Sequence, residues 1–141
     1  MTASTIAPLI AIAAALVVAT VIGVLVKRRW GVLRETSSEP TELDTTDLGL
    51  SRTGPTVVHF SAVWCGPCAA VRRVVSQVCG DMPDVAHVEI DMDANPAAAR
   101  RLSVLSLPTT FVFDAEGRQR YRGAGVPKPA DLRSVLAPLL A

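Results

Sequence analysis

The chain is poor in cysteine, histidine, aromatic residues and net charge. Its 141 residues include three Cys and two His, only 4% are aromatic, and 14 Lys and Arg against 13 Asp and Glu leave a formal charge of +1. Three cysteines are too few for a disulfide-dense secreted scaffold, and so small a charge gives no electrostatic footprint for nucleic acid. The length supports one domain of ordinary size. The 50% hydrophobic content excludes disorder over most of the chain.

Charged side chains are absent from the first 26 residues. Residues 6–26 are an apolar run interrupted only by Pro8, Thr20 and Gly23. As a helix this run would be about 31 Å long, which matches a hydrocarbon core of about 30 Å. A buried helix of a soluble protein is the alternative, but a small domain cannot enclose a run of this length that has no polar face. We therefore predict a transmembrane anchor over residues 1–30, in contact with lipid through residues 6–30.

A secretory signal peptide is the nearer alternative to an anchor, but it would start with a positive region and have a shorter apolar stretch. Here no Lys or Arg precedes the run. The residues that follow it are three consecutive cations and an interfacial aromatic, namely Lys27, Arg28, Arg29 and Trp30. Because positive flanking residues stay on the cytoplasmic side, we predict a single-pass protein with its N-terminus outside and its domain in the cytoplasm. Reversed topology, with the domain outside the cytoplasm, remains the alternative.

A linker and one folded domain are predicted after the anchor. Residues 31–49 lack apolar periodicity and collect Ser, Thr, Pro, Gly and acidic residues, which is typical of a flexible linker with an end-to-end distance of about 24 Å. Residues 42–50 contain a weak strand pattern. The elements predicted within residues 50–141 are strand 56–61, helix 68–79 closed by Gly80, strand 85–92, helix 96–102 with Asn95 as its N-cap, strands 109–114 and 118–122, and helix 128–140. This order predicts an α/β fold whose central mixed sheet is flanked by helices.

The residues that carry chemistry lie between the first predicted strand and the first predicted helix, in the sequence Trp64-Cys65-Gly66-Pro67-Cys68. Two cysteines three residues apart at the start of a helix lie on one face, close enough to form a disulfide. Cys65 is expected at the helix N-terminus, where free N–H groups and the macrodipole favour the thiolate. We therefore predict that Cys65 is the nucleophile and that Cys68, one turn further on, resolves the mixed disulfide.

Residues 50–141 resemble the thioredoxin family, because WCGPC at residues 64–68 follows a strand and opens a helix as that family's active-site motif does. Leu107 and Pro108, before the third strand, resemble the family's cis-proline loop. Gly125 resembles the glycine that borders the family's substrate groove. The resemblance implies a thioredoxin-like fold, and it implies a groove for protein disulfides formed by the residues Trp64, Gly66, Pro67, Leu107, Pro108 and Gly125.

The sequence departs from the family at the acid–base pair near the motif. The resemblance places His59 where the family usually has a buried Asp, and Glu89 where it usually has a Lys. One hypothesis is that His59 accepts the proton of Cys68 during resolution, with Glu89 orienting or stabilising its ring. The alternative is that His59 is a neutral core residue bonded to the backbone. The strand and helix that usually open the fold are also short or missing, which leaves one edge of the sheet undefined.

Other chemistry is disfavoured by the spacing of the remaining residues. A zinc site needs four suitably spaced ligands, and no second close pair accompanies the two motif cysteines. Haem attachment fails because Ala69, and not His, follows Cys68. No metal and no cofactor is therefore predicted. Cys79 has helical spacing with neighbouring valines and is read as a small buried hydrophobe, with a regulatory thiol as the alternative. His87 is read as a partly exposed strand residue.

The function predicted from these features is the reduction of protein disulfides near a membrane, through a mixed disulfide on Cys65. The Gly66-Pro67 dipeptide lacks the His found in strongly oxidising relatives, so the resemblance favours reduction over oxidation. The expected partners are protein disulfides, membrane-bound ones included, and an electron donor such as a thioredoxin reductase. Two alternatives stay open: an extracytoplasmic thiol oxidoreductase and a non-catalytic adaptor that uses the fold for docking.

Overall fold

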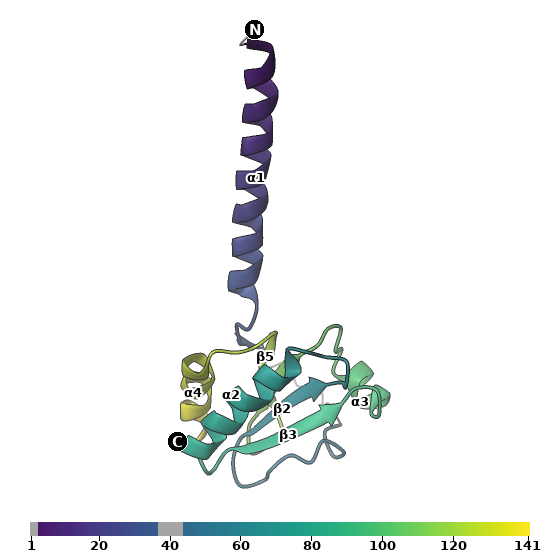
Figure 1. Ribbon diagram of the computed structural model, residues 1–141. Helices are drawn as coiled ribbons and strands as arrows, with labels where there is room; N and C mark the ends of the chain where they lie inside the picture. Colours follow the sequence, from purple (N-terminus) through teal and green to yellow (C-terminus); the bar gives the residue numbers. More distant parts are fainter. Residues whose placement is uncertain (1–2, 37–43) are drawn as a thin grey trace. The chain divides into compact units, whose positions relative to one another are not determined.

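A computed structural model describes residues 3–36 and 44–141 of the chain. The chain divides into two compact units, Met1–Trp30 and Gly31–Ala141 (Figure 1). The helices and strands are α1 Ala3–Arg29, β1 Arg34–Glu35, β2 Thr56–Ser61, α2 Cys68–Asp81, β3 Ala86–Asp91, α3 Pro96–Arg101, β4 Thr109–Phe113, β5 Gln119–Ala124, α4 Pro129–Leu136 and the 3₁₀ turn η1 Ala137–Leu139.

The first unit is the helix α1, whose side chains are exposed from Ile6 to the end of the helix. The segment Ile6–Arg29 is long and apolar enough to cross a membrane, and a signal sequence near an N-terminus meets the same criterion. Three cations occupy its last turn, where positive charge interacts favourably with the helix macrodipole. The predicted N-terminal apolar helix is therefore present.

The second unit is built on a mixed sheet with the strand order β1-β5-β4-β2-β3 in the described part of the chain. The strands β2 and β3 are parallel, and the other neighbouring pairs are antiparallel. The parallel pair is joined through α2, and a hairpin joins β4 to β5, as the predicted element order requires. The predicted α/β fold with a central mixed sheet is confirmed.

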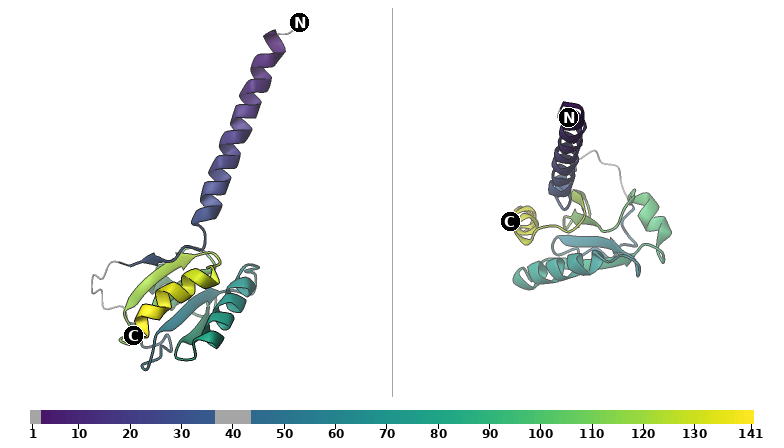
Figure 2. Two further views of the ribbon diagram at one scale, coloured as in Figure 1. Left: turned by 90° about the vertical axis from the view of Figure 1, so that its left-hand side faces the viewer. Right: turned by 45° about the horizontal axis from the view of Figure 1, so that its top comes forward.

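The core has two layers, one on each face of the sheet, because side chains along each strand point alternately to the two faces. On one face Val57 and Val112 pack against α2 and α4, which lie side by side in Figure 2. On the other face Val58, Phe60 and Phe111 pack against the small residues of α3. Successive residues of a strand point to opposite faces. His59 therefore belongs to the same face as Val57, underneath the helix that begins at Cys68.

Both ends of the segment predicted as a linker belong to the second unit. Residues 34–35 form β1 at the edge of the sheet, paired antiparallel with β5, and Leu48 is buried in the core layer of α3. Residues 37–43 lie outside the described part of the chain. The weak strand pattern predicted at 42–50 corresponds to a turn in its described portion. A two-residue strand has too few positions to show alternation, which is why it escapes a pattern analysis.

Several helix ends differ from their predictions, and the helix predicted at 128–140 is the shorter α4 followed by η1. The helix α2 continues through Gly80 to Asp81, and it ends at Met82, whose N–H donates to the carbonyl oxygens of Val78 and Cys79. Asn95 is the N-cap residue of α3, but its side-chain oxygen accepts no hydrogen bond from the first turn, and its amide nitrogen donates to the carbonyl oxygen of Asp91 at 3.0 Å.

Candidate active site

Cys65 and Cys68 form a disulfide with an S–S distance of 2.05 Å and a Cα–Cα distance of 5.5 Å. Cys68 is the first residue of α2 and is buried, whereas Cys65 is partly exposed in the preceding turn. The helix thus begins at the residue predicted for its start, and Cys65 lies in the turn before it. Pro67 occupies the N-cap with φ −65°, and it lacks the N–H that the N-terminal end of a helix leaves unpaired. The Cys65 sulfur still lies at the helix N-terminus, because it is bonded to the sulfur of Cys68.

The turn before the disulfide presents apolar surface to solvent. Trp64 is exposed, and its indole Nε1 donates to Asp93 Oδ2 at 3.0 Å. Gly66 and Pro67 are also exposed. Val63 keeps 94% of its surface accessible, which is unusual for a valine at the end of a buried strand.

The residues predicted to border the substrate groove meet at the same end of the sheet. The Leu107–Pro108 peptide bond is cis. The β2–β4 register pairs Phe60 with Thr109, so Pro108 lies where β2 leads into the disulfide turn. Gly125, with φ +86°, donates its N–H to the carbonyl oxygen of Pro108 at 2.9 Å. The fold thus brings three segments that are distant in sequence to one end of the sheet.

His59 lies beneath α2 with no exposed surface. Its Nδ1 is 3.0 Å from Nε2 of His87, which comes from the neighbouring strand β3. Glu89 is next to His59 in the β2–β3 register, and its Oε1 is 3.6 Å from Nε2 of His59. That separation is too long for a hydrogen bond. Both Glu89 oxygens instead accept hydrogen bonds from Arg72 of α2, at 2.7 and 2.5 Å.

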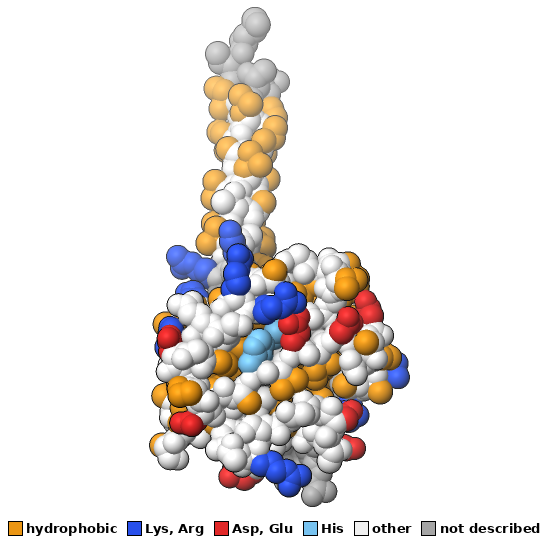
Figure 3. All heavy atoms as spheres, turned by 60° about the horizontal axis from the view of Figure 1, so that its bottom comes forward, with side chains coloured by type: hydrophobic (Ala, Val, Ile, Leu, Met, Phe, Trp, Pro, Cys, Tyr) orange, Lys and Arg blue, Asp and Glu red, His pale blue; other side chains and the backbone are white. Residues whose placement is uncertain are grey.

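The direct partner of His59 is therefore His87, for which the sequence predicted only a partly exposed position on a strand. His87 and Glu89 are two residues apart on one strand and share a face. Either side chain can reach the neighbouring strand, so spacing alone does not distinguish them. The two imidazole rings stack with centroids 5.0 Å apart. Figure 3 shows histidine atoms reaching the surface beside an acidic and a basic side chain.

Burial controls the electrostatics of this cluster. Desolvation lowers the pKa of His59 to about 4, and the nearby Glu89 carboxylate offsets only part of that effect. Desolvation also lowers the pKa of His87. The hydrogen bonds from Arg72 lower the pKa of Glu89 to about 2. At neutral pH His59 and His87 are therefore uncharged, while Glu89 and Arg72 form an ion pair above them.

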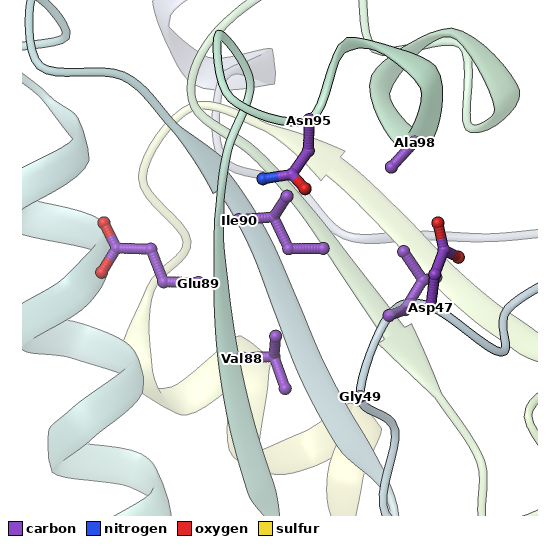
Figure 4. Close-up of a pocket in the computed structure, with 8 residues that line it drawn as sticks. Asp47, Gly49, Val88, Glu89, Ile90, Asn95 and Ala98 are labelled. Atoms are coloured by element: carbon purple, nitrogen blue, oxygen red, sulfur yellow. The ribbon is translucent and has the colours of Figure 1, made fainter.

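The cavity drawn in Figure 4 is separate from this cluster. It has a volume of about 280 Å³ and lies on the α3 side of β3, where Val88, Ile90 and Ala98 line it. The Glu89 side chain points away from the cavity, as strand alternation requires (Figure 4). The cavity and the disulfide therefore belong to different faces of the sheet.

The remaining ligand-type residues do not form a second centre. Within residues 3–36 and 44–141, no three His, Cys, Asp or Glu side chains are arranged to hold a metal ion. Cys79 is partly buried against the layer beneath α2 and α4. Burial raises the pKa of its thiol. The thiolate is therefore disfavoured at Cys79, in agreement with its interpretation as a small hydrophobe.

Three comparisons with known proteins agree with this geometry. The thioredoxin from Mycolicibacterium smegmatis is 45% identical over 47% of this chain and 60% of its own length. Among solved structures, oxidised mitochondrial thioredoxin 3 from Saccharomyces cerevisiae matches with a TM-score of 0.56 and 26% identity, over 70% of this chain and 88% of that one. Oxidised thioredoxin O2 from Arabidopsis thaliana matches with a TM-score of 0.53 and 31% identity, over 63% and 77%.

The family model named Thioredoxin matches residues 44–137, about two thirds of the chain. The chain spans between 60% and 66% of the length of the mycobacterial relatives that it matches. The fold, the bonded cysteine pair and the family match point to one conclusion: this chain is a thioredoxin-type redox protein and belongs to the thioredoxin family.

Proposed function

We propose that the chain is a membrane-anchored thiol–disulfide oxidoreductase that reduces protein disulfides. The observation that carries the proposal is the Cys65–Cys68 disulfide at the first residue of α2, at the sheet end where Pro108 and Gly125 lie. A dithiol at a helix N-terminus donates two electrons to a substrate as it closes into a disulfide, and the disulfide accepts two electrons again from a donor.

In the proposed reaction the two cysteines act in sequence. The Cys65 thiolate attacks one sulfur of the substrate disulfide, which breaks the substrate S–S bond and releases the other sulfur as a thiolate. The Cys68 thiolate then attacks the Cys65 sulfur, which frees the second substrate thiol. The substrate gains two electrons and the protein ends as the Cys65–Cys68 disulfide. Cys65 suits the first step because it is partly exposed, and Cys68 suits the second because it is buried beside it.

We propose that His59 accepts the proton of the Cys68 thiol during the second step. His59 is uncharged at neutral pH, lies on the sheet face that α2 covers, and contacts His87 toward the edge strand β3. General-base catalysis contributes about 10²–10⁴-fold, and a base whose pKa lies well below the working pH gives the lower end of that range. In this arrangement Glu89 acts on His59 only through its charge, since its hydrogen bonds go to Arg72.

Replacing His59 tests this assignment. His59→Ala should slow the second step by about 10²-fold at pH 7 and change the pH profile of turnover. Thr110→Val is the matched control, because Thr110 lies opposite His59 across β2 and β4 and does not titrate. An unchanged profile in His59→Ala would remove His59 from the mechanism.

The membrane context is part of the same proposal. The segment Ile6–Arg29 would span the bilayer, with the cations at its end on the cytoplasmic side and the domain beyond them in the cytoplasm. The electron donor would then be a cytoplasmic dithiol system such as a thioredoxin reductase. A cysteine introduced at Thr2 should react with a membrane-impermeant thiol reagent in intact cells. Protection of that cysteine until the cells are lysed would reverse the topology.

The activity itself is tested with insulin, whose disulfides report reduction by precipitation. The full chain, reduced beforehand and held in detergent micelles, should reduce insulin at a rate that Cys65→Ser abolishes. A protein that closes its own disulfide yet leaves insulin intact would be an adaptor and not a reductase.

A further inference from the structure

The chain enters its redox domain at the reactive end of the sheet. The Gly31 N–H donates to the carbonyl oxygen of Ala124 at 2.5 Å. The next residue, Gly125, donates its own N–H to the carbonyl oxygen of Pro108 at 2.9 Å. Two backbone hydrogen bonds and one peptide unit therefore connect the first residue of the domain to the cis-proline loop.

Residues 31–36, which we term the entry strap, lie along the whole of β5. The strap pairs Arg34 with Arg122, and the Thr36 N–H donates to the carbonyl oxygen of Arg120 at 2.9 Å. At its far end, the Gln119 side chain donates to the Thr36 hydroxyl at 2.8 Å. These bonds follow β5 from its last residue back to its first.

Two glycines allow the backbone of the strap to approach the backbone of the domain closely. Gly31 is buried and has φ +82°, and a Cβ placed there would collide with the carbonyl oxygen of Val126. A Cβ on Gly123 of β5 would approach the carbonyl oxygen of Val32 to 2.8 Å. Backbone approaches this close need residues without side chains. The strap is therefore held in place by its backbone geometry as well as by its hydrogen bonds.

Because the strap is bonded to β5, almost no unbonded chain remains between the apolar helix and the reactive end of the sheet. Only Trp30 lies between the last residue of α1 and Gly31. The two residues from Arg29 to Gly31, even when fully extended, span at most about 7 Å, whatever direction the helix takes. A free linker of residues 31–49 would instead allow about 24 Å of root-mean-square reach.

The surface at this end suits an apolar partner segment. Val63, in the turn after β2, and Leu105, in the loop before β4, are 94% and 92% exposed, and Trp64 between Val63 and the disulfide is 64% exposed. These highly exposed apolar side chains lie in segments at the same end of the sheet as the disulfide turn. Segments that flank a membrane span are rich in residues that favour such contacts.

We propose that the entry strap restricts the Cys65 groove to disulfides in the juxtamembrane segments of other membrane proteins, within a few residues of the bilayer. This inference rests on the proposed reductase function and membrane span. The sulfur chemistry is unchanged; the strap limits which disulfides the reduced protein can reach.

The test varies reach without touching the groove. A ten-residue Gly-Ser insert between Trp30 and Gly31 lengthens the chain ahead of the strap. The same insert between Glu39 and Pro40 lies after the strap and is the matched control. Each full-length variant, reduced beforehand, is reconstituted in phosphatidylcholine–phosphatidylglycerol vesicles with a single-span peptide that carries a disulfide-linked reporter 5 or 20 residues from its span.

The near and far reporters should differ in a predictable way. Effective concentration falls as about the −3/2 power of tether length, so the original chain should reduce the near reporter about eightfold faster. The insert before Gly31 adds ten residues to the tether length for the near reporter and for the far reporter, and it should lower the ratio of the two rates to about threefold. The insert after the strap should leave it at about eightfold. Equal ratios in all three proteins, or a preference for the far reporter, would overturn the proposal.

Reduction of a small soluble aromatic disulfide by the same vesicles separates this inference from the function on which it rests. Activity on that compound with no near preference refutes the strap's role alone. Absence of activity on it refutes the reductase function, and release of the protein from floated vesicles refutes the membrane span.

Discussion

Acid should destabilise the oxidised domain through His59, and the size of the effect follows from its burial. The side chain has no exposed surface, and desolvation lowers the pKa of His59 to about 4 from 6.5. Between pH 4 and pH 6.5 this histidine is protonated in the unfolded chain but not in the folded chain, so the free energy of unfolding rises with pH. The stabilisation is complete above pH 6.5 and is lost as the pH falls toward 4. From pH 7 to pH 5 the loss is about 2 kcal/mol.

The groups that face His59 shift this window little. His87 has a lowered pKa for the same reason and adds a loss of the same sign. Glu89 also has a lowered pKa, about 2, so its contribution is lost only below about pH 4.5. Arg72 stays charged throughout, since its pKa is raised by Glu89. The interval from pH 7 to pH 5 therefore isolates the histidines.

The assay is thermal unfolding of the oxidised full chain in detergent micelles at pH 7 and pH 5, followed by tryptophan fluorescence. A loss of about 2 kcal/mol corresponds to a fall in Tm of roughly 10 °C for a domain of this size. His59→Gln, which cannot titrate, should lose about 2 kcal/mol less over the same interval. Thr110→Val should behave as the original chain does. Parallel pH curves for His59→Gln and the original chain would refute the burial argument.

Three further predictions concern other parts of the domain. Cys68→Ser should accumulate mixed disulfides with substrate proteins on Cys65, visible as reductant-sensitive bands on a gel, whereas the double variant with Cys65→Ser should show none. Arg122→Met should destabilise the domain by about 1–3 kcal/mol in thermal unfolding, because it removes hydrogen bonds to the carbonyl oxygens of Leu102 and Ser103 and a cation–π contact at 5.2 Å from the Phe111 ring centre; an unchanged Tm would contradict this. Gly31→Val should release the entry strap and speed hydrogen exchange at the Thr36 amide by at least about tenfold, without loss of activity on a soluble disulfide. Gly49→Ala is the control, because Gly49 also has a positive φ of +68° but has open space around its Cβ position, and it should leave that exchange unchanged.

The sequence predicts the central elements well because each has a strong local signal. The segment Thr56–Ser61 is rich in β-branched and aromatic residues, and it forms β2 over the same six residues. The valines at helical spacing after Cys68 form the buried stripe of α2. Both signals come from period and composition, and packing reinforces them. The same applies to the apolar run of α1.

The features that escape the sequence depend on partners distant along the chain. Arg34 and Glu35 become a strand only because β5 offers an open edge beside them. The contact between His59 and His87 depends on the register of β2 against β3, which period alone does not give. In each case tertiary structure decides between options that are locally equivalent.

The entry strap links two properties of this domain that are usually independent. An exposed edge of β5 would invite pairing with other chains, and two residues of β1 cover part of it. Because the covering segment is also the one that follows α1, the hydrogen bonds that close the edge also fix the length of free chain. A substitution that loosens the strap would therefore expose the edge and extend the reach together. An insertion ahead of Gly31 changes only the reach, which is why it, and not a strap variant, separates substrate access from sheet stability.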